Sequence, residues 1–186
     1  MKKIIAFVCL GLLAACMTLP SPKMFVQDGR ETDAVQLRAN SLRVVSNVHY
    51  SDAYPNVEYK MPINPEQALI TWAYNHFRAN DMNTPVTATL TINQASMTGT
   101  NVPTPSIFTY DNIEYRLDYN VTLTFENRGE VINEYTAVGY EMETMPARKA
   151  IDFAPKTWEK MLNRMIDKLS VKLNEGVPAN LRINQR

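Results

Sequence analysis

One stretch of the chain, residues 112–125, reads NIEYRLDYNVTLTF and alternates between apolar and polar side chains at every step. Successive side chains of a β-strand point to opposite faces, so the alternation predicts one apolar and one polar face. This pattern is typical of an antiparallel sheet that is covered on one side and open to water on the other. Burying a large apolar side chain contributes about 1.5–3 kcal/mol, so this face decides the fold. The apolar face comprises Ile113, Tyr115, Leu117, Tyr119, Val121, Leu123 and Phe125.

Three further strands are predicted around this one. Residues 86–93 show the same clean alternation, and residues 42–50 predict a first strand. A tight turn at residues 127–129 leads into a last strand over residues 131–142, whose alternation is mixed. Either both faces of that strand are partly covered, or a bulge near Gly139 shifts its register.

Two helices are predicted to cover the apolar face. The first begins with Asn64 as its cap and Pro65 as its first residue, and it ends near Asn80. The second runs from about Pro155 to Glu175, with a possible separate helical turn before it. The order β-α-β-β-β-α predicts an α+β domain, a two-layer sandwich of a four-stranded antiparallel sheet with two helices on one face. The predicted apolar stripes are Leu69, Trp72, Ala73, His76 and Phe77, then Trp158, Met161, Leu162, Met165, Ile166, Leu169 and Leu173.

The N-terminus carries the most specific motif. Lys2 and Lys3 precede an apolar run that ends in Leu13-Ala14-Ala15-Cys16, which predicts a secretory signal peptide. Residues 4–15 are too few to span a bilayer, which takes about 20 apolar residues. The ending resembles the lipobox of bacterial lipoproteins, which implies that Cys16 is acylated, as with palmitate, and becomes the first mature residue. Met17 follows rather than aspartate, and the resemblance then implies the outer membrane, with the domain facing the periplasm.

The chain therefore divides into four predicted parts. These are a lipoprotein signal peptide at 1–15, a lipidated N-terminus and tether at 16–40, one α+β domain at 41–178, and a C-terminal tail at 179–186.

The order of elements and the lipobox, taken together, resemble those of a group of small envelope lipoproteins. The best-known members of that group assist lipopolysaccharide assembly or serve as auxiliary lipoproteins of lipid-transport ABC systems. Pro55-Asn56-Val57-Glu58, Pro62, and Pro65 leading to Trp72-Ala73 resemble an uncharacterised alphaproteobacterial group of lipoproteins. That group offers no catalytic motif to carry over. The resemblance implies a binding or scaffolding role at the outer membrane, with the membrane and an envelope protein as partners.

The charge balance and the cysteine content argue against several classes of function. The chain has 19 basic and 19 acidic residues, and loss of Lys2 and Lys3 leaves 17 minus 19, or −2. This near-balance argues against nucleic acid as a partner. The cysteines are Cys9 and Cys16, so the mature protein has no disulfide and no free thiol for catalysis. We expect neither a cofactor nor a metal site.

An enzyme is not expected either. His76 lies on the apolar stripe of the first helix and is interpreted as a core residue, while His49 lies near a strand end. Glu141 and Glu143 share a strand face, which a solvated strand end explains. No hydrolase or phosphate-binding motif is present. The set Glu114, Arg116 and Asp118 is interpreted as part of the wet sheet face, which faces either water or another chain.

Two loops carry more apolar side chains than a plain surface loop needs, at residues 99–110 and 54–61. They predict docking onto a partner protein, or else local packing of Phe108 and Tyr59 onto the sheet edge. The partner-binding candidates are Ile107, Phe108, Tyr54 and Tyr59.

A carrier of lipid or a small ligand is the alternative function. Nine methionines remain after Met1, and this adaptable side chain suits an apolar groove between helices and sheet. The other interpretation is that these methionines fill the helix–sheet interface.

Overall fold

The computed structural model describes residues 34–105 and 111–183, excluding the side chains of residues 150–153. The signal peptide, Cys16 and most of the expected tether lie outside these residues. The strands are β1 (Val35–Leu37), β2 (Ser41–Ser46), β3 (Phe77–Ala79), β4 (Val86–Val102), β5 (Asn112–Asn127) and β6 (Glu130–Pro146). The helices are α1 (Pro65–His76) and α2 (Ala150–Gly176), with short 3-10 turns η1 (Glu58–Lys60), η2 (Ala147–Lys149) and η3 (Ala179–Leu181).

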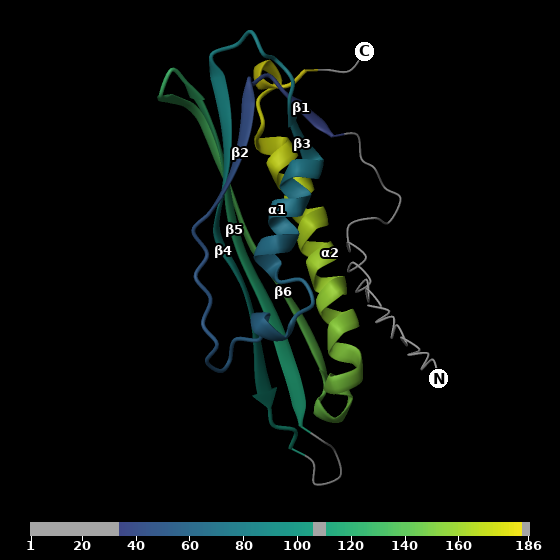
Figure 1. The fold of residues 1–186 in the computed structure, drawn as a ribbon. Helices are drawn as coiled ribbons and strands as arrows, with labels where there is room; N and C mark the ends of the chain where they lie inside the picture. The colour runs from purple at the N-terminus through teal and green to yellow at the C-terminus, as the bar shows by residue number, and fades with distance from the viewer. Residues whose placement is uncertain (1–33, 106–110, 184–186) are drawn as a thin grey trace, which may run out of the picture.

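The main sheet has the strand order β2-β4-β5-β6, and α1 and α2 lie side by side on one of its faces (Figure 1). The α+β class and the two helices on one face are therefore confirmed. The prediction of a wholly antiparallel sheet is wrong, because β2 pairs with β4 in parallel. The chain passes from β2 to β4 through α1, and a helical crossover of this kind brings neighbouring strands into the same direction.

Helix α1 begins as predicted, since Asn64 Oδ1 accepts a hydrogen bond from the Gln67 N–H at 2.9 Å. It ends at His76, earlier than expected, because Phe77 adopts an extended backbone and opens β3. Strand β3 pairs in parallel with β1 and forms a second, two-stranded sheet.

The folded unit extends beyond both expected boundaries. Leu37 and Ala39, placed in the expected tether, are fully buried. The C-terminal residues join them: the Arg38 N–H donates to the Leu181 carbonyl and the Ile183 N–H to the Gln36 carbonyl, both at 2.9 Å. The two ends of the described chain therefore pack against each other.

Two other predicted boundaries are also wrong. Strand β4 continues to Val102, so residues 99–102 are strand rather than loop; a register shift between Ile92 and Gln94 interrupts its pairing with β5. Helix α2 runs without a break through Pro155, because a proline ring fits helical φ and its missing N–H removes a single backbone bond.

The core lies between the helices and the inner face of the sheet. The apolar residues of β5 from Tyr115 to Phe125 are all buried, as the alternation predicts. Two hydrogen bonds tie the helices together over this layer, from Trp72 Nε1 to Ser170 Oγ and between His76 Nε2 and Asn174 Oδ1, both at 3.0 Å.

The irregularity of β6 lies at its start rather than near Gly139. The register shifts between Phe125 and Glu126 of β5, which leaves Ile132 as the extra residue of β6. Gly139 stays in the regular ladder opposite Tyr119, and a Cβ built on it would lie 2.3 Å from the buried Tyr119 hydroxyl oxygen. The glycine therefore makes room for an aromatic side chain of the core.

We expect Gly139→Ala to lower the free energy of unfolding by about 1–3 kcal/mol, because the new methyl group overpacks the core against Tyr119. Urea denaturation measures this cost. In a Tyr119→Leu background the same alanine should cost much less, since the ring it meets is gone. Equal costs in both backgrounds would contradict this account.

Candidate functional site

The face of the main sheet opposite α1 and α2 stays open in the described part of the chain (Figure 1). We call it the outer face. The polar side chains of β5 lie here exposed or half-buried, as the alternation predicts. The outer face carries Thr89, Thr91, Gln94, Ser96 and Thr98 of β4, then Glu114, Arg116, Asp118, Asn120 and Thr122 of β5, and Thr136, Val138, Tyr140 and Met142 of β6.

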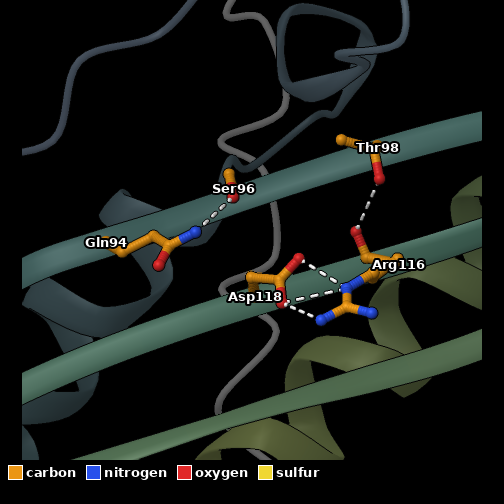
Figure 2. A network of polar contacts seen from close by, with 5 residues as sticks. All are labelled: Gln94, Ser96, Thr98, Arg116 and Asp118. Atoms are coloured by element: carbon orange, nitrogen blue, oxygen red, sulfur yellow. Dashed lines mark hydrogen bonds and ion pairs between the residues drawn. The ribbon is translucent and has the colours of Figure 1, made fainter.

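A network of polar contacts crosses the middle of the outer face (Figure 2). Arg116 donates from Nη2 to Asp118 Oδ1 at 2.8 Å and from Nε to Oδ2 at 2.9 Å. Thr98 Oγ1 donates to the Arg116 carbonyl at 3.5 Å, and Gln94 Nε2 donates to Ser96 Oγ at 3.3 Å. The carboxylate of Asp118 raises the pKa of Arg116, first through the hydrogen bond and then through its negative charge.

An apolar stripe borders this network on β6. Val138, Tyr140 and Met142 are 56%, 54% and 41% exposed, and we call them the β6 stripe. The Arg116 guanidinium carbon lies 4.6 Å from the centre of the Tyr140 ring, a cation–π contact. The alternation within β6 places these three side chains on one face of the sheet. The missed signal is a run of large apolar residues on the face that neighbouring strands keep polar.

The loop at residues 54–61, one of the two predicted docking loops, lies beside the edge of β4. The Val57 N–H donates to the Met97 carbonyl at 2.9 Å, and the Gly99 N–H donates to the Pro55 carbonyl at 2.8 Å. The buried Glu58 completes the contact, since its Oε1 accepts from the Met97 N–H at 2.8 Å. This segment therefore pairs with β4 beyond the end of β2.

Tyr54 and Tyr59 project from that loop and are 72% and 57% exposed. Such exposure does not fit the alternative in which Tyr59 packs onto the sheet edge, while partner binding by either tyrosine stays a prediction. Ile107 and Phe108 lie outside the described residues.

Glu141 and Glu143 were expected at a solvated strand end, and for Glu141 this is wrong, because it is 5% exposed. Its carboxylate pairs with Arg164 Nε at 3.2 Å and with Lys168 Nζ at 2.5 Å. Glu143 pairs with Arg164 Nη2 at 2.9 Å and with Lys160 Nζ at 3.2 Å. The hydrogen bond from Arg164 is the main cause of a lowered pKa at Glu143, and the bond to Glu141 raises the pKa of Lys168.

The histidines take the places that the sequence suggested. His76 is buried, stacks on Trp72 at 5.3 Å between ring centres and is hydrogen-bonded to Asn174, so its interpretation as a core residue is confirmed. Burial lowers its pKa, although the bond to Asn174 acts in the opposite direction. His49 is exposed, with Nδ1 2.8 Å from the Asn47 carbonyl oxygen.

Within residues 34–105 and 111–183, no three His, Cys, Asp or Glu side chains gather as they would around a metal ion. Across the same ranges, no helix combines the length and the apolar character needed to cross a membrane.

Comparison with known proteins gives structural likeness alone. No family model and no curated protein matches the chain. The chain is similar to a minor lipoprotein from Acinetobacter baumannii at 17% identity and a TM-score of 0.39, covering 81% of this chain and 98% of that one. It is similar to rare lipoprotein B from Shewanella oneidensis at 11% identity and a TM-score of 0.42, covering 73% of this chain and 94% of that one. It is also similar to an uncharacterized lipoprotein B from Nitrosomonas europaea at 12% identity and a TM-score of 0.40, covering 75% of this chain and 86% of that one.

Burial of His76 predicts a pH dependence of stability. The lowered pKa means that the unfolded chain takes up a proton first, near the ordinary histidine pKa of about 6.5, so acidification favours unfolding. We expect the melting temperature to fall as the pH drops below about 6.5, and to fall less in His76→Gln. The exposed His49→Gln is the control and should keep the slope of the natural protein. A His76→Gln slope equal to that of His49→Gln would exclude His76 as the cause.

Proposed function

We propose that this protein is a lipid-anchored envelope protein that binds a partner protein through the outer face of its sheet. The observation that carries the proposal is the β6 stripe, exposed next to a fixed polar network on a face that the described elements leave open.

The chemistry of the outer face fits a protein surface. Interfaces between proteins are enriched in tyrosine and arginine, and they combine an apolar centre with hydrogen-bonding groups around it. Here Tyr140 and Arg116 stack on each other, and Asp118 holds the guanidinium. Side chains that already make such contacts lose less conformational entropy on binding than free ones.

The anchor part of the proposal rests on Leu13-Ala14-Ala15-Cys16. Acyl chains on Cys16 would hold the protein at the membrane, and two or more chains make such attachment stable. An extended chain over residues 16–33 reaches at most roughly 60 Å, enough to let the domain meet an envelope partner. We propose the outer membrane as its location, with the domain in the periplasm.

The methionines give the carrier alternative little support. Met97, Met161 and Met165 are fully buried in the core between helices and sheet. Each packs among the other core side chains, as expected of methionines that fill the helix–sheet interface.

Tyr140→Ser tests the docking face. Crosslinking in intact envelopes should capture a partner with the natural protein and lose the same band with Tyr140→Ser, because the centre of the stripe is removed. Tyr74→Ser on α1 is the matched control, since Tyr74 is 52% exposed. Both variants should melt within a few degrees of the natural protein. Capture that survives Tyr140→Ser would overturn docking at this face.

Cys16→Ser tests the anchor separately. We expect the natural protein to incorporate labelled palmitate and to pellet with the outer membrane, and the serine variant to do neither. A natural protein that stays unlabelled would contradict lipidation, whatever the outcome for Tyr140.

A further inference from the structure

Strand β6 is an edge of the main sheet, and one contact shows which of its backbone groups face away from β5. Lys172 Nζ donates to the Val138 carbonyl at 2.8 Å, so this carbonyl points away from β5. In an antiparallel pair, the N–H and C=O of one residue point the same way, and the direction alternates along the strand. From residue 134 to residue 144, the even-numbered residues therefore present their backbone groups at the edge.

A row of cations on α2 runs along the same edge. We call Lys156, Lys160, Arg164, Lys168 and Lys172 the basic row. Each lies four residues from the next, so consecutive members of the row are neighbours on the helix surface. The contacts of the last four with Glu143, Glu141 and the Val138 carbonyl show that these four face β6.

The basic row is only partly neutralised by its own sheet. The four cations from Lys160 to Lys172 face β6, where Glu141 and Glu143 supply two carboxylates, whereas the whole chain has 19 basic and 19 acidic residues. The Lys160 and Lys168 side chains are 60% and 55% exposed, and each ammonium has three donors of which one meets a carboxylate. Donors therefore remain for an acidic group that arrives from the solvent side of the edge.

We propose that the edge of β6 binds an extended segment of the partner protein as a fifth strand, a segment that alternates acidic and apolar residues. A strand added at an edge gains backbone hydrogen bonds, and its side chains alternate between two faces. Its carboxylates would lie under the basic row, and its apolar side chains would continue the β6 stripe on the outer face. This inference rests on the proposed function and names the part of the partner that the protein recognises.

The charges favour such a partner over a second copy of the chain. Two β6 edges paired around a two-fold axis would bring two basic rows together, which like-charge repulsion opposes. Lys172 donates a hydrogen bond to the Val138 carbonyl at the edge, and lysines commonly protect sheet edges against pairing. A carboxylate offers that ammonium a stronger acceptor than a neutral carbonyl, so an acidic strand can displace it.

The test uses two acetylated, fluorescent nonapeptides, one of alternating glutamate and valine and one of alternating lysine and valine. Fluorescence anisotropy should show binding of the glutamate peptide to the folded domain, weaker at higher salt, and no binding of the lysine peptide. Val138→Pro should weaken binding at least tenfold, because proline removes an N–H that faces the edge rather than β5. Tyr74→Ser on α1 lies outside this surface and is the control, expected to bind within a few-fold of the natural protein.

Lys172→Glu provides a second variant that leaves the backbone intact, and it should also weaken binding at least tenfold. The inference is overturned if the glutamate peptide does not bind, if both peptides bind equally, or if Val138→Pro and Lys172→Glu bind as well as the natural protein. A dimer in sedimentation that Val138→Pro dissociates would assign the edge to a second copy instead. Loss of crosslinking in Tyr140→Ser without peptide binding would leave the proposed function standing and exclude the strand at the edge.

Discussion

The fold depends on the burial of one face of β5 beneath the two helices. Every second side chain from Tyr115 to Phe125 enters the core, where α1 and α2 cover the sheet. A shift of one residue would expose all of these side chains at once, so the register of the neighbouring strands is fixed with high specificity. Around this layer, the Trp72–Ser170 and His76–Asn174 hydrogen bonds hold the helices against each other.

The same alternation sets up the candidate site. Each residue that β5 directs into the core is followed by one that it directs outward, so the packing of the inner layer also sets the backbone positions of the outer face. Arg116 and Asp118 therefore lie opposite Met142 and Tyr140 of β6. The polar network projects from backbone positions that the apolar layer behind it determines.

Local pattern predicted which side chains are buried but not how distant elements meet. The faces of β4 and β5, the cap at Asn64 and the core position of His76 all follow from residues close in sequence. The direction of β2 does not, because alternation is the same in parallel and antiparallel strands. The burial of Glu141 was missed for a similar reason: its cations lie on α2, more than twenty residues further along the chain. The sequence does hold a signal for this contact. It has basic residues at four-residue spacing on the predicted helix and two carboxylates on one face of the predicted strand.

The packing of the two chain ends has a mechanical consequence. Residues 36–38 and 181–183 hydrogen-bond to each other at one end of the sheet, next to the point where the described chain begins (Figure 1). A pull on the N-terminal chain would reach this short contact first and the long β4–β5 ladder only after it. Tension applied from the N-terminal side is therefore borne by the paired chain ends before it reaches the strands that carry the outer face.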